Sequence, residues 1–471
     1  MPLGVLKVAA ALESAGHPVE VLDLSGYSNF TEIAATHAAQ SEARHFGFTA
    51  TTPQFPAAVK LAGTIKSARP DATLILGGPH ATLTVAAAKR EQKNDRQGRA
   101  ARALDSIQTS FHKIVAGDGE LAILQAIADE APQIIDADGR HSALFLNDKA
   151  LDDTAWPARH LVDVGSYHYA IDGASSLSVI AQLGCPFACG FCAGRNSPML
   201  RHIRMRSAEN IVNEMMHLRR EYGIKGVMFY DDELNVNKGM VDLMNRIAAT
   251  EQDWKLRGFV KAELFTDEQS EAMYRAGFRW ILVGFESGSP RILENIRKRA
   301  TQEDNTRCMD IARRHGLKVK ALMSLGHPGE SSSTVEETRQ WLLGVRPDDF
   351  DATIITPYPG SPYYDDAIET VHGVWTYTCK NGDQLHQDEV DYAKDADYYK
   401  GDPNDGYVSH VWTPDLDRAE LVSLRGMLES DVRSALKIAF NPSAVSQAYE
   451  HSMGMTALPS NILRSSEKVA A

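Results

Sequence analysis

Three cysteines packed into a short stretch near the middle of the chain carry the strongest chemical signal in the sequence. Cys185, Cys189 and Cys192 form the pattern Cys-x3-Cys-x2-Cys. Three thiolates on one loop can each hold a different iron of a cubane [4Fe–4S] cluster, which leaves the fourth iron without a protein ligand. The alternative is structural zinc, but such sites take four protein ligands, and no fourth Cys or His lies at a suitable spacing. An iron–sulfur cluster is therefore the favoured interpretation.

Charge and composition bound the class of protein. The chain has 471 residues, of which 43% are hydrophobic and 24% charged, and its formal net charge is −13. Such an acidic chain lacks the excess of Lys and Arg that a nucleic-acid partner requires. No apolar run approaches the roughly 18 residues of a membrane span. The two other cysteines, Cys308 and Cys379, are isolated and form no disulfide framework, so we expect a cytoplasmic protein without nucleic-acid or membrane partners.

The cysteine loop opens a region, residues 174–370, in which strand and helix patterns alternate. The first helix pattern, residues 208–222, places apolar side chains on one face, and Ser207 ahead of it is a candidate N-cap. Six strand–helix units favour an α/β fold with a partial (β/α)6 barrel. Polar and glycine residues follow the strand ends, which is the edge where such folds bind ligands. The expected strands are residues 176–183, 226–230, 256–262, 280–285, 319–324 and 352–356.

The cysteine loop, with Phe191 directly before the third cysteine, resembles the signature of the radical S-adenosylmethionine (SAM) superfamily. The resemblance implies that SAM chelates the open iron. It also implies that one electron from the cluster cleaves SAM to methionine and a 5′-deoxyadenosyl radical. Gly326 belongs to the family's fifth-strand glycine motif near the cofactor. The later matching stretches, in the family's order, are FYDDELN at 229–235, GFESG at 284–288, LGHPGE at 325–330 and PYPGSP at 357–362.

The same resemblance implies roles for individual side chains around SAM. Asp232 and Glu233 are expected to bind its amino group, and Glu286 and Ser287 to lie at its ribose or carboxylate. One position departs from the family, because Lys261 stands on the third strand where relatives often carry arginine. The group that binds the SAM carboxylate is therefore open. Candidates to face the substrate, with a packing role as the alternative, are His327, Tyr358 and Tyr363.

Residues 1 to about 130 also alternate strand and helix patterns and predict a Rossmann-like, doubly wound parallel sheet. The first helix is expected to close at Gly16. This region resembles the cobalamin-binding domain that precedes the barrel in one radical SAM subclass. The resemblance implies cobalamin contacts from Gly77, Gly78 and His80, within the stretch GGPHAT. The expected strands are residues 19–24, 43–49, 73–76 and 113–116.

Two departures from the cobalamin-binding pattern leave that cofactor open. The sequence has no Asp-x-His-x-x-Gly motif, which would supply a histidine to cobalt from below. It also begins at the residues that normally follow the first strand of the domain. We therefore expect a domain without that strand, in which the glycine turns are either cobalamin contacts or ordinary turns.

The remaining segments give weaker signals. Residues 131–173 have little periodicity and are expected to be a linker, and residues 89–102 look like a polar excursion from the N-terminal domain. Residues 371–471 are aromatic and acidic at first, including Tyr398 and Tyr399, and then predict a helix from 415 to about 439. The basic run at residues 201–206 is either a solvated loop or an anion contact near the active site.

These resemblances imply a biosynthetic transferase, with cobalamin-dependent methyl transfer to a small molecule or peptide as the leading reaction. An electron donor such as flavodoxin or ferredoxin would reduce the cluster. The alternative is an enzyme without functional cobalamin that rearranges its substrate or transfers the 3-amino-3-carboxypropyl group of SAM, for instance to arsenic. A non-catalytic electron carrier is the hypothesis from another class. A methylthiotransferase of the known family would need an N-terminal cysteine triad, and no cysteine precedes Cys185.

Overall fold

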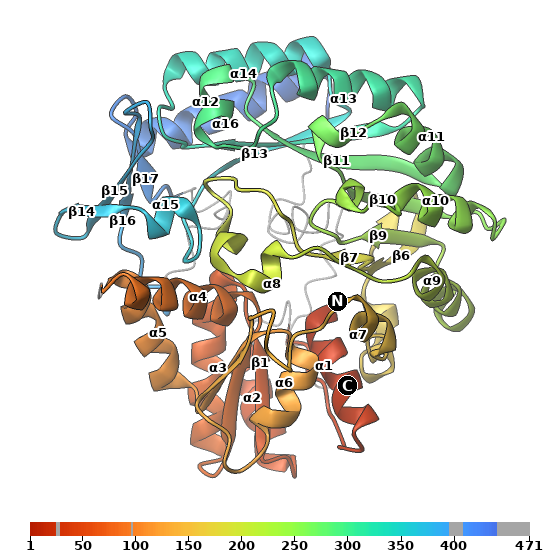
Figure 1. Cartoon of the computed structure of the whole chain (residues 1–471), viewed down its shortest axis with the longest axis vertical. Coiled ribbons are helices and arrows are strands. Elements are labelled where there is room, and N and C mark those ends of the chain that lie inside the picture. Colours follow the sequence, from red (N-terminus) through yellow and green to blue (C-terminus); the bar gives the residue numbers. More distant parts are fainter. Residues whose placement is uncertain (25–28, 96–97, 395–407, 440–471) are drawn as a thin grey trace.

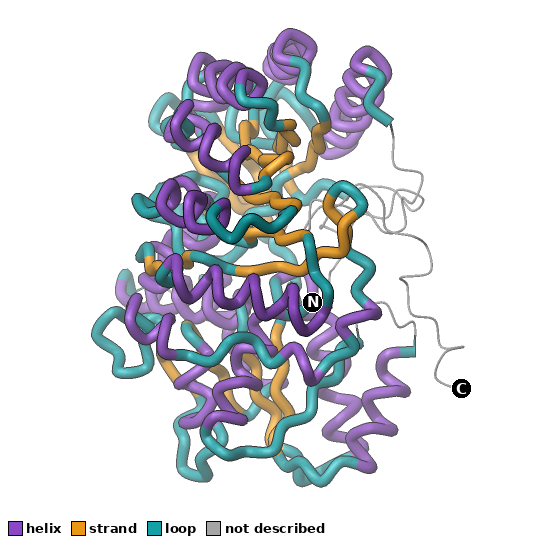
Figure 2. The backbone as a smooth tube through the Cα atoms, turned by 90° about the vertical axis from the view of Figure 1, so that its right-hand side faces the viewer, coloured by secondary structure: helices purple, strands orange, loops and turns teal. Residues whose placement is uncertain are grey.

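Two sheets of mainly parallel strands organise the chain, and the cysteine loop lies between these two sheets (Figure 1). The computed structural model describes residues 1–24, 29–95, 98–394 and 408–439. One unit is the N-terminal sheet with its helices, and the other is a curved sheet with helices on its outer side, a stacking that Figure 2 shows from the side. The expected α/β class, a Rossmann-like unit ahead of a partial barrel, is confirmed.

The N-terminal unit is a four-stranded parallel sheet with the order β1-β2-β3-β4. Its strands are β1 His45–Thr49, β2 Thr73–Gly77, β3 Lys113–Gly117 and β4 Ile134–Ala137. Its helices are α1 Leu3–Ser14, α2 Phe30–Gln40, α3 Phe55–Ala68, α4 Pro79–Lys93, α5 Arg99–Ser110 and α6 Gly119–Ala126. On one face of the sheet, Val8 of α1 packs with Val115 of β3 and with α6. Phe55 and Ile107 lie in the core of the other face, under α2, α3 and α5. Burial of both faces explains the continuous apolar runs in β2 and β3.

Residues 19–24, expected as a strand, are extended but pair with no strand of the described chain. Val19 and Val21 pack against α1, whereas Leu24 packs with Phe46 and Phe48 on the opposite side. The alternation that predicted the strand is therefore real. A strand also needs a neighbour to complete its hydrogen-bond ladder. Within the described ranges no strand bonds to this segment, so the prediction of a sheet strand is wrong.

The segment expected as a linker, residues 131–173, contributes a strand to the sheet. β4 pairs in parallel with β3 from Ile114 to Gly117. The segment continues through helix α7 (Asp148–Asp153) and ends in strand β5 (Ala170–Ile171). Both strands are too short to give a periodic pattern in the sequence, which explains why they were not expected.

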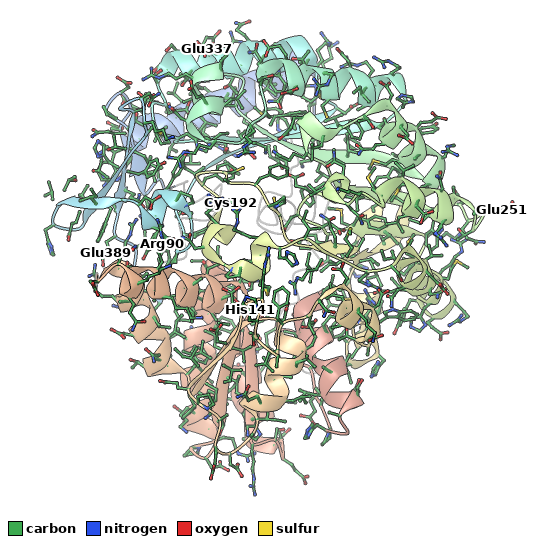
Figure 3. All side chains as sticks on the ribbon, viewed as in Figure 1. Arg90, His141, Cys192, Glu251, Glu337 and Glu389 are labelled. Atoms are coloured by element: carbon green, nitrogen blue, oxygen red, sulfur yellow. The ribbon has the colours of Figure 1, made fainter. Side chains whose placement is uncertain are left out.

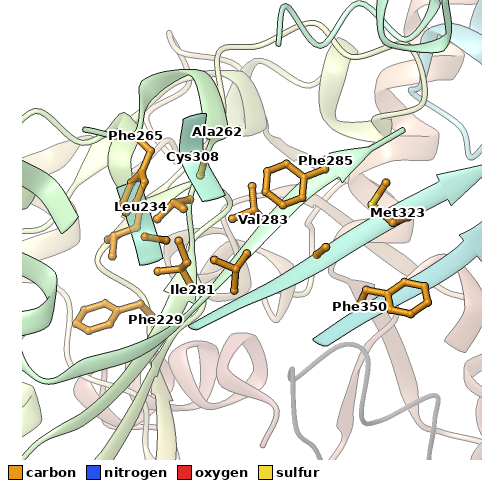
Figure 4. Close-up of a cluster of buried hydrophobic side chains, with 14 of the residues drawn as sticks. Phe229, Leu234, Ala262, Phe265, Ile281, Val283, Phe285, Cys308, Met323 and Phe350 are labelled. Atoms are coloured by element: carbon orange, nitrogen blue, oxygen red, sulfur yellow. The ribbon is translucent and has the colours of Figure 1, made fainter. Parts of the chain in front are cut away.

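The second unit is a partial barrel built on a seven-stranded sheet with the order β13-β12-β11-β10-β9-β6-β5. Each expected barrel strand forms in the expected place along the chain, and β5 adds an antiparallel partner to β6. Figure 4 shows part of the buried hydrophobic core of this unit, which includes Phe229, Val283 and Phe285. The bounds are β6 Ala174–Val179, β9 Gly226–Phe229, β10 Lys255–Phe259, β11 Phe278–Glu286, β12 Lys318–Leu325 and β13 Asp349–Ile354.

The first outer helix of the barrel begins and ends where the sequence signals predict. Helix α9 (Ala208–Tyr222) begins after Ser207, whose hydroxyl accepts the amide of Asn210, and it ends at Gly223 in the left-handed conformation. The other helices are α10 Met240–Ala248, α11 Asp267–Ala276, α12 Pro290–Asn295, α13 Gln302–Arg314 and α14 Ser332–Val345. No helix of the described segments is long and apolar enough to span a membrane.

The C-terminal region contains an unexpected antiparallel sheet. Strands β14 Ile368–Val371, β15 Val374–Thr378, β16 Gln384–Asp388 and β17 Val411–Trp412 follow the short helix α15 (Pro362–Asp365). The expected helix forms as α16 (Arg418–Leu436), with Asp417 as its N-cap, and it packs on α14 and β13. Tyr398 and Tyr399, which belong to the expected aromatic segment, lie outside the described residues.

The polar stretch at residues 89–102 is not an excursion, because its arginines join the N-terminal unit to the C-terminal sheet. Arg99 is 4% exposed and lies between the rings of Tyr364 and Trp375, at 3.6 and 4.6 Å from their centroids. Its guanidinium donates to the Tyr364 carbonyl at 2.6 Å and to the Gln387 side chain at 3.0 Å. Arg102 pairs with Glu389 at 2.7 Å nearer the surface, where Figure 3 labels Glu389.

We predict that Arg99→Ala weakens the attachment of the N-terminal unit. The substitution leaves buried acceptors unpaired and removes two cation–π contacts. We therefore expect the free energy of unfolding to fall by about 2–4 kcal/mol. Arg102→Ala is the matched control, and its more exposed ion pair is worth about 1 kcal/mol or less. The midpoint of urea denaturation compares the two variants. Equal midpoints would contradict the role given to Arg99.

Candidate active site around the cysteine loop

The cysteine loop lies at the centre of the molecule, between the two units, where Figure 3 labels Cys192. It runs from strand β7 (Gln182–Leu183) to helix α8 (Pro198–Arg201), and β7 pairs with β8 (Arg204–Met205) to close the loop at its base. Among the described residues, no three His, Cys, Asp or Glu side chains are placed to hold a single metal ion. A cubane cluster takes each thiolate on a different iron, and three thiols on one loop are the donor set for it.

The thiols sit in surroundings that disfavour free thiolates. Burial raises the pKa of the Cys185 thiol to about 12 and also raises the pKa of Cys189. Iron must therefore displace a proton from each thiol when it binds. Lys298 and Lys261 partly offset the effect at Cys189, because their positive charges favour the thiolate.

Two glycines fix the path of the loop. Gly184 has a φ of +88°, and a Cβ there would lie 2.1 Å from the carbonyl oxygen of His202. At Gly190 a Cβ would lie 2.4 Å from the ring of Tyr363. The Gly190 amide donates to the Ile296 carbonyl at 2.8 Å, and the Tyr363 amide donates to the Gly190 carbonyl at 3.0 Å. The loop is thus held by α12 on one side and α15 on the other.

Three acidic residues follow β9 and have different environments. Asp231 accepts the backbone amides of Ala181, at 3.0 Å, and of Gln182, so it anchors the start of the cysteine loop. Burial raises the pKa of Glu233 to about 7, although the nearby lysines oppose the shift. The pKa of Asp232 is also raised by burial. Carboxyl groups in this state gain most from a cationic ligand, because an ammonium group restores the charged form.

A network of charged and polar groups lies at the end of β11. Glu286 accepts hydrogen bonds from Lys298 Nζ and from Ser324 Oγ, each at 2.8 Å. Ser324 Oγ also lies 2.8 Å from His327 Nε2. Burial alone would raise the pKa of Glu286, but Lys298 and the hydrogen bonds outweigh burial and hold it below its usual value. The backbone φ of Glu286 is +65°, which costs a non-glycine residue on the order of 1–3 kcal/mol.

Lys261, the residue in place of arginine, is buried and engaged. Its Nζ pairs with Glu263 at 2.6 Å, donates to the Lys298 carbonyl at 3.1 Å and lies 4.2 Å from the centroid of the Phe187 ring. Lys298, which the sequence did not single out, brings a second buried ammonium group beside Glu233. No local pattern marks Lys298, because its role depends on the contact of its ammonium group with Glu286 at the end of β11.

The other predicted cofactor contacts differ in placement. Phe191 packs edge-on against His327 with the ring centroids 5.5 Å apart, and Gly326 makes the adjoining turn with a φ of +86°. Ser287 points away, since its hydroxyl is buried 3.0 Å from Thr338 Oγ1 on α14. A cofactor contact of Ser287 stays a prediction. Of the substrate candidates, the structure joins His327 and Tyr363, with Nδ1 and the hydroxyl 3.5 Å apart, whereas Tyr358 packs on the N-terminal core.

A cavity of about 1850 Å³ extends from the N-terminal sheet to the start of the cysteine loop. At one end, its lining includes Gly77, Gly78 and Gly117 in the turns after β2 and β3. At the other end, it includes Gly184 and Asp232, which adjoin Cys185 and Glu233 along the chain. Pockets for drug-sized ligands occupy about 300–1,000 Å³, so this cavity has room for a larger cofactor.

The predicted cobalamin contacts divide between this cavity and the core. Gly78 has a φ of +89°, and a Cβ there would lie 2.4 Å from Thr49 Oγ1, so only glycine fits this turn. His80 is not part of the cavity lining. Its ring stacks on Phe55 with the centroids 4.2 Å apart, its Nδ1 lies 3.2 Å from Thr52 Oγ1, and burial lowers its pKa to about 3. His80 is therefore a neutral core residue in this structure, and its cobalamin contact stays a prediction.

The basic run at residues 201–206 is used inside the protein and is not a solvated loop. Arg201 donates to the carbonyls of the cysteine loop, at 2.8 Å to Pro186 and 3.0 Å to Phe187. Arg204 pairs with Asp118 at 2.5 Å, and both side chains are buried and line the cavity. The sequence did not pair Arg204 with Asp118, since 86 positions separate them along the chain.

Comparison with protein-family models assigns both units. Residues 179–342 match the radical SAM superfamily, a span that includes the cysteine loop and the Glu286 network. The chain belongs to the radical SAM superfamily. Residues 1–105 match the B12-binding domain. This radical SAM enzyme therefore carries a B12-binding domain ahead of its barrel.

Relatives of this radical SAM enzyme include a methyltransferase and a cyclase. An uncharacterized methyltransferase of Pyrococcus horikoshii is 27% identical over 380 residues, 78% of each chain. An anaerobic magnesium-protoporphyrin IX monomethyl ester cyclase of Rubrivivax gelatinosus is 22% identical over 420 residues, 84% of this chain and 72% of that one. Among solved structures, the radical SAM methyltransferase TsrM of Kitasatospora setae, with cobalamin and a [4Fe–4S] cluster bound, superposes with a TM-score of 0.61 at 16% identity. The match covers 100% of this chain and 97% of that one, and it shows the shared fold.

We predict that replacing Cys185, Cys189 or Cys192 by alanine removes most of the iron from this radical SAM enzyme. Each loss leaves one more iron of the cluster without a protein ligand. Iron content and visible charge-transfer absorption after anaerobic reconstitution check this. Cys379→Ala is the control and should retain the wild-type content of about four irons per chain. Full iron content in any of the three loop variants would contradict the ligand assignment.

Proposed function

We propose that this radical SAM enzyme is a cobalamin-dependent methyltransferase that acts on a small molecule. When bound, the cluster supplies the electron that cleaves SAM, and cobalamin supplies the methyl group. The cavity is the observation that carries the proposal, because one continuous space touches the glycine turns of the B12-binding domain and the start of the cysteine loop. A methyl carrier held at the first position can therefore lie close to SAM at the second.

The residues around the cysteine loop match the charges of SAM. Glu233 and Asp232 bind the amino group, because an ammonium ion offsets the burial that raises their pKa values. Lys298 is held by Glu286 at 2.8 Å, so it presents a fixed positive charge for the SAM carboxylate. Phe191 packs edge-on against His327, which adjoins the Glu286 network through Ser324. These groups bind and orient the cofactor.

The glycine turns at the other end allow a large cofactor to approach the backbone. Gly77 and Gly78 leave no side chain between the cavity and the carboxyl end of β2. Asp118 and Arg204 compensate one another at 2.5 Å, so this ion pair adds no net charge to the wall beside these turns. We further propose that a flavodoxin or a ferredoxin is the electron donor and that the substrate is a small molecule or a peptide.

Filling the cavity at Gly77 tests the cobalamin site. A Cβ at Gly77 meets only ordinary contacts, the nearest being 3.8 Å away at Val115, so Gly77→Leu should fold and place its side chain in the cavity. We expect the variant to bind cobalamin at least about tenfold more weakly than wild type. Gly77→Ala is the matched control, and absorbance titration with hydroxocobalamin gives the dissociation constants. Equal binding by the leucine variant, or no binding by wild type, would refute the site.

The products of SAM distinguish methyl transfer from the alternative reactions. With reconstituted enzyme, SAM, hydroxocobalamin and dithionite, we expect mass spectrometry to detect two products. One is 5′-deoxyadenosine from cleaved SAM, and the other is S-adenosylhomocysteine from the SAM that methylates the cobalamin. Transfer of the 3-amino-3-carboxypropyl group would instead release methylthioadenosine, which would overturn the proposal. Deoxyadenosine formed at the same rate with and without bound cobalamin would favour a rearrangement or cyclisation, the reaction of the cyclase relative.

A further inference from the structure

The turn directly after the third cysteine carries an arginine whose charge is not compensated within the described chain. Cys192 is the N-cap of this short helical turn, η4 (Ala193–Asn196), which packs against α4 and α8. Arg195 lies in the turn and is half-buried. It forms no hydrogen bond or ion pair with another described residue. A guanidinium group that could bind a partner molecule therefore lies three positions from a residue expected to hold the cluster.

Two further arginines lie close to Arg195. Burial lowers the pKa of the Arg195 guanidinium, and the nearby charges of Arg201 and Arg297 lower it further. Arg201 bonds backbone carbonyls of the cysteine loop, and Arg297 donates to the Tyr377 hydroxyl at 2.6 Å. Neither forms an ion pair with any residue that the structure describes. The three side chains together therefore give the outside of the cysteine loop a positive charge.

The other charges on this side of the loop compensate one another. Arg90 of α4 also lies near Arg195, but it pairs with Asp366 at 2.5 Å and lies 3.7 Å from Asp365. Figure 3 labels Arg90 and Cys192 on the viewed side of the molecule. The uncompensated charge on this side therefore belongs to Arg195, Arg201 and Arg297, which we call the arginine surface.

The segment after α12 directs neighbouring basic side chains to different places. Lys298 is buried and pairs with Glu286, whereas Arg297 and Arg299 on either side of it are exposed. Arg297 has a φ of +56° and Arg299 a φ of +68°, and each costs on the order of 1–3 kcal/mol for a non-glycine residue. This strained path places one ammonium group at the proposed SAM site and leaves Arg297 outside the site.

The rest of the protein has the opposite charge. The formal net charge of the chain is −13, so an acidic protein is repelled by most of the molecule. A local positive surface can still attract and orient such a partner, because charges at the rim of an interface steer the encounter. Complexes of electron-transfer proteins need little contact area, often less than about 1,200 Å² in total. A surface of three arginines is therefore sufficient to guide a transient complex.

We propose that Arg195, Arg201 and Arg297 form the docking surface for an acidic one-electron carrier protein of the flavodoxin type. The carrier gives up one electron, and the cluster accepts it and passes from the 2+ to the 1+ state, while no bond forms or breaks. Docking at η4 brings the carrier next to Cys192, so the electron crosses only a short stretch of protein. This inference rests on the proposed function, which includes such a donor.

Binding of oxidised flavodoxin to the reconstituted full chain tests the arginine surface. Arg195→Glu reverses one of its charges and breaks no contact with a described residue. We expect its dissociation constant, from titration calorimetry at low salt, to be at least about threefold that of wild type. Wild-type binding should also weaken as salt is added.

Lys225→Glu is the matched control for this experiment. Lys225 is exposed and lies directly ahead of β9, at the edge of the barrel sheet opposite the cysteine loop. The substitution changes the net charge by the same amount as Arg195→Glu, so it should leave the dissociation constant close to that of wild type. Equal dissociation constants for the two variants would overturn the docking surface.

Two reductants separate docking from catalysis. With limiting reduced flavodoxin, Arg195→Glu should form 5′-deoxyadenosine at least about threefold more slowly than wild type. With reduced methyl viologen, a small cation that needs no acidic docking partner, the two should react at equal rates. Equal slowing with both reductants would overturn the proposal. Absence of deoxyadenosine from wild type with either reductant would refute the proposed function, and the dissociation constants would still decide the docking surface.

Discussion

Both parallel sheets turn their carboxyl ends towards one shared space, and the chemistry of the protein depends on that placement. Turns after parallel strands expose backbone and polar groups at this edge, so the glycines at Gly77 and Gly117 and the loop that starts at Gly184 all reach the same cavity. A fold with the units apart would have the same motifs and no common site. The orientation is held by buried contacts such as those of Arg99, which join α5 to the C-terminal sheet.

Burying the charged groups around the cysteine loop is unfavourable in free energy, which indicates that these groups bind a ligand. Removing an ion from water costs several kcal/mol even after relaxation, and Glu233, Glu286, Lys261 and Lys298 all lie in one small region. Apolar residues of similar size would stabilise the barrel at least as well. A ligand with both an ammonium and a carboxylate group, such as an amino acid moiety, complements this arrangement of both signs.

The parts of the fold and site that the sequence predicted are those set by local pattern. The cysteine spacing, the barrel strands, helix α9 and the acidic residues after β9 all follow from periodicity or short motifs. Ser287 and His80 lie in motifs of the right kind, yet their side chains pack against α14 and Phe55. A motif specifies where the backbone runs, whereas the direction of each side chain depends on packing with distant elements.

Pairing across the chain is what the sequence could not supply. The charge pattern of residues 89–102 and 201–206 is that of a solvated surface, but Arg99 and Arg204 find partners 265 and 86 positions away. Residues 19–24 show the reverse case, since their alternation is that of a strand but no ladder joins them to another described segment. An isolated segment can specify which side chains share a face, but a strand exists only with its neighbour. The state of residues 19–24 is therefore a property of the whole sheet and cannot be read from the six residues themselves.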